Sequence, residues 1–373
     1  MSSTSSEPTL ATLTAQRWSS DRAQAWHRRL PWLVGGNFTP STASNQLEMW
    51  QAETFDPQTI DRELGWAAVI GMTSMRVFLH DLCWASDAAG FLARIDQYLA
   101  IASKHGIGTL IVFFDSCWHP VPRLGRQEEP IPRTHNSRWV QSPGTEILST
   151  PGGFAALKGY VQGVMTRFRD DPRIHGWDLW NEPENDQSGK PFGALDLGKR
   201  KAAVVLPCLY QAYAWAREVA PSQPLTSGVW TGDFSADKLT ALQRLQIEAS
   251  DIVSYHCYGD GAAMATCIAQ LAATNRPLWC TEYMSRPSGS TFAATLPLLA
   301  EQRIGAYNWG LVAGRTQTHF SWDSWAKTYP DEPPLWFHEV FRRDGTPYDA
   351  AEATLIRNLT RSVAARSAAS ATG

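Results

Sequence analysis

The stretch IHGWDLWNEP at residues 174–183 decides how this chain of 373 residues folds. Its apolar part predicts a buried strand, and Pro183 ends that strand because proline has no N–H to continue a sheet. A carboxyl group, Glu182, is therefore expected at a strand end beside the amide of Asn181. The run PLWCTEY at residues 277–283 carries a second such carboxyl group, Glu282, again at the end of an apolar strand.

Working outward, strand-like runs alternate with segments of helical period along the chain. Eight strands are predicted, at residues 32–37, 74–80, 109–115, 174–180, 225–229, 252–258, 278–282 and 305–311. Helices are predicted at residues 56–70, 91–104, 154–168, 202–219, 236–248, 262–274 and 291–302. This order favours an α/β fold with a single (β/α)8 TIM barrel over an open doubly wound sheet, because no glycine-rich phosphate loop follows the first strand.

We expect one catalytic domain at residues 31–360, preceded by an N-terminal extension at 1–30 and followed by a flexible tail at 361–373. Long connections are predicted at residues 37–55, 116–152 and 313–325, and in a barrel the loops after the strands build the active site. Asn37 and Trp50 in the first of these are substrate-binding candidates. Bulky residues in the loops predict that one end of the cleft is closed, namely Trp50, Trp118, Trp139, Trp322 and Trp325.

Other polar and aromatic side chains also mark predicted strand ends. Arg76 belongs to the second strand, and Trp309 to the eighth. His256 and Tyr258 are two residues apart on the sixth, so they project from the same face. Two carboxyl groups on one barrel rim suit cleavage of a glycosidic bond, in which one protonates the leaving oxygen and the other attacks the sugar carbon.

The ordered set Arg76, Asn181-Glu182-Pro183, His256-x-Tyr258, Glu282 and Trp309 resembles clan A of the glycoside hydrolases, and within it family 5, which contains cellulases and mannanases. The resemblance implies that Glu182 is the acid/base and Glu282 the nucleophile. It further implies that the other members bind or position the substrate, namely Arg76, Asn181, His256, Tyr258 and Trp309.

Electrostatics favours the same division of labour between the two carboxyl groups. Arg76 is expected to keep Glu282 ionised, whereas Glu182 should hold its proton to a higher pH because it is desolvated near a second carboxylate. The sequence departs from family 5 cellulases after the third strand, where Asp115 is followed by Ser116 and Cys117. The nearest histidine, His119, is a candidate for the substrate pocket.

Composition limits the partners. The formal charge of −3 shows no basic stripe for nucleic acid, and no run is long and apolar enough to span a membrane. No cofactor and no metal are expected, because an acid and a nucleophile suffice for the reaction and the sequence shows no cluster of cysteine and histidine ligands. The expected partner is an oligosaccharide substrate. The first residues have neither the basic start nor the apolar core of a secretory signal, which predicts a cytoplasmic enzyme.

Several alternatives stay open at this level. The favoured hypothesis is a retaining, exo-acting β-glycosidase on short β-linked oligosaccharides, with β-mannoside first and β-glucoside or β-xyloside next. An endo-β-mannanase or endo-β-glucanase is the alternative mode of attack. Two other classes are a metal-dependent sugar isomerase, with Glu182, His256 and Glu282 as ligands, and a barrel that binds carbohydrate without cleaving it. Oligomeric state cannot be inferred from the sequence.

Overall fold

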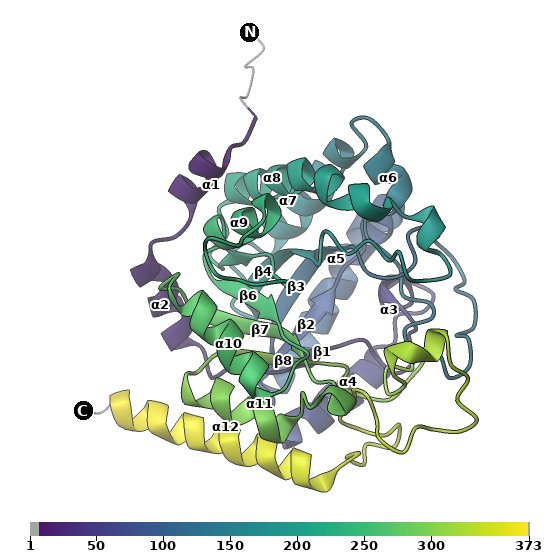
Figure 1. Ribbon diagram of the computed structural model, residues 1–373, viewed down its shortest axis with the longest axis vertical. Coiled ribbons are helices and arrows are strands. Elements are labelled where there is room, and N and C mark those ends of the chain that lie inside the picture. The colour runs from purple at the N-terminus through teal and green to yellow at the C-terminus, as the bar shows by residue number, and fades with distance from the viewer. Residues whose placement is uncertain (1–6, 372–373) are drawn as a thin grey trace.

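The computed structural model describes residues 7–371 and contains a parallel β-barrel surrounded by helices (Figure 1). The strands are ordered β5-β4-β3-β2-β1-β8-β7-β6 in one eight-stranded sheet. A parallel bridge from Val229 to Tyr255 joins the two ends of this order and closes the barrel. The (β/α)8 fold predicted from the sequence is therefore confirmed.

All eight predicted strands are present, with some ends shortened. Their bounds are β1 Val34–Asn37, β2 Ser74–Phe78, β3 Gly108–Asp115, β4 Ile174–Asn181, β5 Leu225–Thr226, β6 Val253–His256, β7 Leu278–Tyr283 and β8 Gly305–Trp309. The bounds of the α-helices are α1 Leu10–Gln16, α2 Ser20–Arg29, α3 Gln46–Trp50, α4 Pro57–Val69, α5 Asp81–Lys104, α6 Thr145–Ser149, α7 Lys158–Arg167, α8 Lys201–Val219, α9 Ala241–Glu248, α10 Gly261–Ala272, α11 Phe292–Glu301 and α12 Ala350–Ala371.

Local sequence explains where several helices begin. The Asp56 side chain accepts a hydrogen bond from the Thr59 N–H, and Pro57 occupies the first turn, so α4 begins where the sequence predicts. α9 begins at Ala241, later than predicted, because Thr240 and Gln243 form a capping box there. α5 begins ten residues before the predicted helix, and its kink at Asp87 interrupts the helical period in the sequence.

The termini pack along the barrel. Helix α2, in the predicted N-terminal extension, donates from Trp26 Nε1 to the carbonyl of His175 at the start of β4 (3.2 Å). The segment from residue 361, predicted as a flexible tail, is helical to Ala371 as part of α12, where Val363 is buried and alanine favours helix. Residues 1–6 of the predicted extension and 372–373 of the tail lie outside the described residues.

Two long connections run side by side at the rim of the barrel. The connection after β3 (residues 116–153) and the connection after β8 (residues 310–349) are joined through Asn136 N–H to the Thr316 carbonyl (2.8 Å) and through His135 N–H to Ser324 Oγ (3.0 Å). Trp325 Nε1 also donates to the His135 carbonyl at 2.8 Å. We call this junction the loop seam. Its residues His135, Asn136 and Trp322 line the space above the strand ends.

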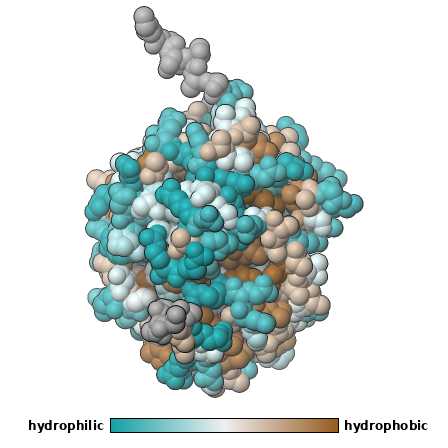
Figure 2. All heavy atoms as spheres, turned by 90° about the vertical axis from the view of Figure 1, so that its left-hand side faces the viewer, coloured by the Kyte–Doolittle hydropathy of each residue, from teal (hydrophilic) through white to brown (hydrophobic). Residues whose placement is uncertain are grey.

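Within residues 7–371, no helix combines the length and hydrophobicity needed to cross a bilayer. Figure 2 shows the face on the left-hand side of Figure 1, where hydrophilic side chains dominate and hydrophobic ones gather in the right half of the view.

Candidate active site

The two strand-end glutamates meet above the barrel. Glu182 directly follows β4, and Glu282 lies near the end of β7, where the register with both neighbouring strands shifts. Such bulges re-aim side chains, and here an oxygen of each carboxyl group lies within 4.8 Å of the other. Glu182 has a φ of +44°, a conformation that costs a non-glycine residue about 1–3 kcal/mol and is concentrated at functional sites.

Arg76 is the buried hub of the site. Its guanidinium donates to Glu282 Oε1 (2.8 Å), to Asn37 Oδ1 (2.8 Å) and to Asn181 Oδ1 (2.7 Å). Two more hydrogen bonds reach Asp178 Oδ2, at 3.1 and 2.8 Å. Asp178 was not predicted as a site residue, although a charged residue within an apolar strand demands a buried partner. The planar fork of arginine thus fixes two carboxylates and two amides at once.

His256 and Tyr258, predicted from their spacing, both reach the carboxyl groups. Tyr258 OH donates to Glu282 Oε2 at 2.8 Å, so both oxygens of this carboxylate accept a hydrogen bond. His256 Nδ1 lies 2.8 Å from Glu182 Oε1 and 3.6 Å from Glu282 Oε2. Burial lowers the pKa of His256 to about 4, so the imidazole is neutral at pH 7. It bridges the two carboxyl groups without adding a charge.

Burial raises the pKa of both glutamates. For Glu282 it reaches about 7, raised by burial and by repulsion from Glu182, and opposed by His256 and by the adjacent Arg76. The pKa of Glu182 is also raised by burial, with hydrogen bonds from Asn185 and Cys117 opposing the shift. The direct ion pair with Arg76 belongs to Glu282 alone. Arg76 therefore favours ionisation at Glu282 over ionisation at Glu182.

Two neighbours of Glu182 were not predicted from the sequence. Cys117 Sγ donates to Glu182 Oε2 (3.1 Å), and Asn185 Nδ2 donates to the same oxygen (2.7 Å). Cys117 occupies the place where the third strand departs from the family 5 pattern, which was the one signal available. Asn185 follows Glu182 by three residues in a turn, and nothing in the local sequence distinguishes it.

A cleft of about 380 Å3 opens above the two glutamates, a size suited to a small-molecule ligand. Trp309 lies in this cleft, as predicted. Of the tryptophans predicted to close the cleft, Trp118 and Trp322 line it, and Trp325 stacks on Trp118 with ring centroids 5.8 Å apart. Trp139 is buried, and its Nε1 donates to Asp115 Oδ2 at 2.6 Å.

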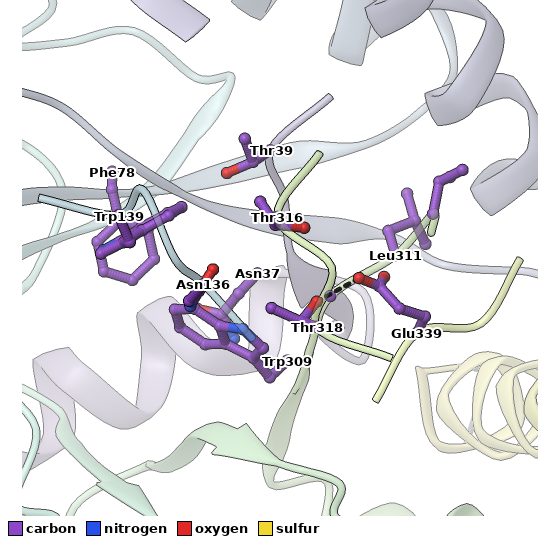
Figure 3. A pocket seen from close by; sticks show the side chains of 12 residues that line it. Asn37, Thr39, Phe78, Asn136, Trp139, Trp309, Leu311, Thr316, Thr318 and Glu339 are labelled. Carbon is purple, nitrogen blue, oxygen red and sulfur yellow. Dashed lines mark hydrogen bonds between the residues drawn. The ribbon is translucent and has the colours of Figure 1, made fainter. Parts of the chain in front are cut away.

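A smaller niche adjoins the cleft and shares Asn136 and Trp309 with it (Figure 3). Its volume of about 10 Å3 is close to the least that holds one water molecule. Asn37, predicted to bind substrate, lines this niche and donates from Nδ2 to the carbonyls of Thr281 (2.9 Å) and Asn308 (3.2 Å). Since its Oδ1 accepts from Arg76, Asn37 acts on the site by orienting the arginine.

Two residues predicted to bind substrate, Trp50 and His119, lie outside the cleft. Trp50 is fully buried at the end of α3, where its Nε1 donates to the Phe78 carbonyl (2.7 Å) and its ring packs edge-on against Phe91 and Tyr98. It is part of the core, because α3 turns its apolar side toward α5.

His119 does not line the cleft. Its ring packs against Phe192, with centroids 5.2 Å apart. Trp118 has a φ of +69° and turns the chain, after which His119 pairs with Val140 in a short bridge.

The site does not suit a metal ion well. Among residues 7–371, one group of acidic, histidine and cysteine side chains is compact enough to hold a cation, and it consists of Glu182, His256 and Glu282. However, every oxygen of the two carboxyl groups faces a hydrogen-bonding partner, and the Arg76 guanidinium adjoins Glu282. A divalent cation would have to displace these partners beside a positive charge.

The fold and the site together define a (β/α)8 barrel with a paired-carboxylate centre on its rim. No family model matches the chain. Over 92 residues, it is 30% identical to a probable mannan endo-1,4-beta-mannosidase A-1 of Aspergillus terreus; this match spans 25% of the chain and 21% of the curated relative's length.

Two solved structures share the fold across most of the chain. A GH5_18 protein of Streptomyces cattleya, solved with GlcNAc, has a TM-score of 0.59 at 14% identity, covering 90% of this chain and 80% of that one. The exo-beta-1,4-mannosidase Op5Man5 of Opitutaceae bacterium strain TAV5 has a TM-score of 0.59 at 18% identity, covering 90% of this chain and 60% of that one. At these identities, the likenesses show a shared barrel fold.

Proposed function

We propose that this protein is a retaining β-glycoside hydrolase that removes one terminal sugar at a time from short β-linked oligosaccharides. The observation that carries the proposal is the approach of the two carboxyl groups to within 4.8 Å, with Arg76 bound to only one of them. Retaining enzymes hold their carboxyl groups about 5–5.5 Å apart, whereas inverting enzymes leave about 6.5–9.5 Å for a water molecule.

In the proposed reaction, Glu282 Oε2 or Oε1 attacks the anomeric carbon while Glu182 gives its proton to the leaving oxygen. The glycosidic bond breaks, and an ester bond forms between the sugar and Glu282. Glu182, now ionised, takes a proton from water, which attacks the same carbon and releases Glu282 as a carboxylate. Arg76 and Tyr258 hold the nucleophile in place, and Trp309 offers an aromatic face to the sugar ring.

The exo mode is supported by the loop seam, which closes one side of the rim through hydrogen bonds between the connections after β3 and β8. A closed end admits one terminal sugar, whereas an endo-enzyme needs an open groove. β-Mannoside is the first sugar to test, since the solved exo-β-1,4-mannosidase shares the fold. An endo-β-mannanase is the second candidate, because the Aspergillus terreus relative is named as a probable mannan endo-1,4-beta-mannosidase.

Variants of the two glutamates test the mechanism. Glu182→Gln lacks the proton donor, so its rate on unactivated substrates should fall by about 10²–10⁴-fold, and less on nitrophenyl glycosides, with azide restoring turnover as a β-glycosyl azide. Glu282→Ala should be inactive, and a 2-fluorosugar should label Glu282 in the parent enzyme. Near-parental rates for Glu182→Gln on unactivated substrate, or labelling of another residue, contradict the assignment.

Product analysis on a defined β-1,4-mannohexaose tests the mode of attack. An exo-enzyme releases monosaccharide from the first minutes, together with the shortened pentaose. Early accumulation of di-, tri- and tetrasaccharides without monosaccharide would establish the endo-mannanase alternative instead.

A further inference from the structure

Asn136 stands in the loop seam in an unusual backbone conformation. Its φ is +47°, in the left-handed region that asparagine tolerates better than most residues. Its N–H donates to the Thr316 carbonyl at 2.8 Å, and its carbonyl accepts from the Trp139 N–H at 3.1 Å. The backbone is thus fixed from both sides, and the side chain, only 1% exposed, is held at the border between the cleft and the niche.

The amide of Asn136 has no protein partner on either side. Neither Nδ2 nor Oδ1 is hydrogen-bonded within the described chain, although both atoms are buried. A buried amide that loses its hydrogen bonds to water costs folding free energy, about 1–3 kcal/mol for each unsatisfied group. Such a group in a native structure calls for an explanation. Because Asn136 lines the cleft above the two glutamates, a ligand hydroxyl that both accepts and donates is the natural partner.

His338, also in the loop seam region, lines the same cleft with a second unsatisfied atom. Its Nδ1 donates to the carbonyl of Met284, which lies one residue past β7. Burial lowers the pKa of His338, so the ring is neutral and Nε2 carries a lone pair. Among residues 7–371, Nε2 has no hydrogen-bonding partner. The ring centroid lies 5.7 Å from that of Tyr258, which binds the predicted nucleophile.

We propose that Asn136 and His338 form a hydroxyl-binding pair that recognises the terminal sugar at the closed end of the cleft. The pair offers two N–H donors on Asn136 Nδ2 and two acceptor atoms, Asn136 Oδ1 and His338 Nε2, which suits two or three hydroxyl groups of a pyranose held against Trp309. Asn136 shares the niche with Trp309, and His338 packs against Tyr258, whose OH donates to Glu282. The pair therefore faces the sugar that becomes attached to Glu282 in the proposed reaction.

This inference rests on the proposed function, and its test uses variant-to-parent ratios on matched substrates. Asn136→Gly removes the amide and tolerates the positive φ, whereas alanine there would add backbone strain. With the best-cleaved aryl β-glycoside, kcat/KM should fall about 10- to 100-fold. With the monodeoxy analogue that lacks the contacted hydroxyl, the variant and the parent should have almost the same kcat/KM. For His338→Gln, the variant and the parent should likewise have almost the same kcat/KM, but with a different monodeoxy analogue.

Gln317→Gly is the matched control. Gln317 also has a positive φ in the loop seam, where its Oε1 accepts from the Arg133 N–H at 2.6 Å, but its side chain does not line the cleft. The Gln317→Gly variant should loosen the loop seam without changing the ranking of the deoxy analogues by kcat/KM. An equal loss for Asn136→Gly on every analogue, an unchanged kcat/KM, or the same pattern in Gln317→Gly would overturn the proposal.

Calorimetric titration of free mannose and its monodeoxy forms separates this inference from the proposed function. If the parent protein cleaves no β-glycoside but binds mannose, and Asn136→Gly weakens this binding about tenfold while leaving one deoxy sugar unaffected, the hydroxyl-binding pair stands and the hydrolase proposal fails. If glycosides are cleaved and the titrations show no such dependence, the pair is refuted and the hydrolase proposal stands.

Discussion

Removal of the positive charge at Arg76 should move the acidic limb of the pH–rate profile to higher pH. Glu282 must be ionised to attack, and burial already raises its pKa to about 7 despite the guanidinium at 2.8 Å. Coulomb's law gives about 6 kcal/mol for such a pair at an effective dielectric constant of about 20, an upper bound before desolvation is subtracted. Adjacent cations usually lower a carboxyl pKa by about 1–3 units.

In Arg76→Met, we therefore expect the pKa that controls kcat/KM to rise by about 1–3 units, so that the variant loses most activity at pH 6 and recovers part of it toward pH 9. Arg76→Lys keeps the charge but cannot make five hydrogen bonds. The pKa of its acidic limb should therefore stay within about one unit of the parent's pKa, while kcat falls. Loss of the cation also leaves Asp178 buried and unpaired, which should cost about 3–5 kcal/mol of unfolding free energy.

The assay is kcat/KM on an activated aryl glycoside from pH 4 to 10, together with urea unfolding at each pH where the rate is compared. Arg167→Met is the control, because Arg167 is half exposed and pairs with Asp96 at the surface at 3.3 Å. This variant should leave both the profile and the stability within error. An acidic limb for Arg76→Met that coincides with the parent's would refute the electrostatic reasoning.

Two further predictions concern stability. Trp50→Phe should lower the unfolding free energy by about 1–3 kcal/mol, because it leaves the buried Phe78 carbonyl without its donor. KM should stay unchanged. A rise in KM without a loss of stability would show that Trp50 contacts the substrate. Burial raises the pKa of Glu339 to about 8, so the stability due to its neutral form is full below about pH 4.5 and is lost as pH rises through 8. Glu339→Gln cannot ionise, so its melting temperature relative to the parent should increase between pH 5 and 9; a constant difference would contradict the assigned pKa.

Much of the barrel and the centre of the site could be predicted, because both depend on short-range patterns. Each strand is an apolar run followed by residues that end a strand, and the parallel strands of a closed barrel bring their carboxyl ends to one rim. Arg76, Glu182 and Glu282 therefore met in space once the strands were assigned. Helix ends were less accurate, since the kink of α5 at Asp87 and the late start of α9 depend on local capping and packing.

The walls of the cleft could not be predicted in the same way. Asn136 and His338 belong to loops without a hydrophobic period. The position of Asn136 depends on hydrogen bonds between segments about 180 residues apart in the chain, and that of His338 on hydrogen bonds to the carbonyls of Thr318 and Met284. Trp50 was misassigned for the related reason that a tryptophan in an irregular connection suits either a sugar platform or the core. Only the turn of α3 against α5 decides between them.

The loop seam separates the chemistry of this protein from the shape of what reaches it. Glu282 and Arg76 lie on strands of the barrel and Glu182 directly follows one, whereas the loop seam consists of two loops tied by a few hydrogen bonds. Shortening either loop would change which ligands reach the two carboxyl groups without moving the carboxyl groups themselves. Under the proposed function, insertions and deletions in these loops are therefore the change by which a lineage, or an engineer, could exchange the trimming of chain ends for cutting within chains.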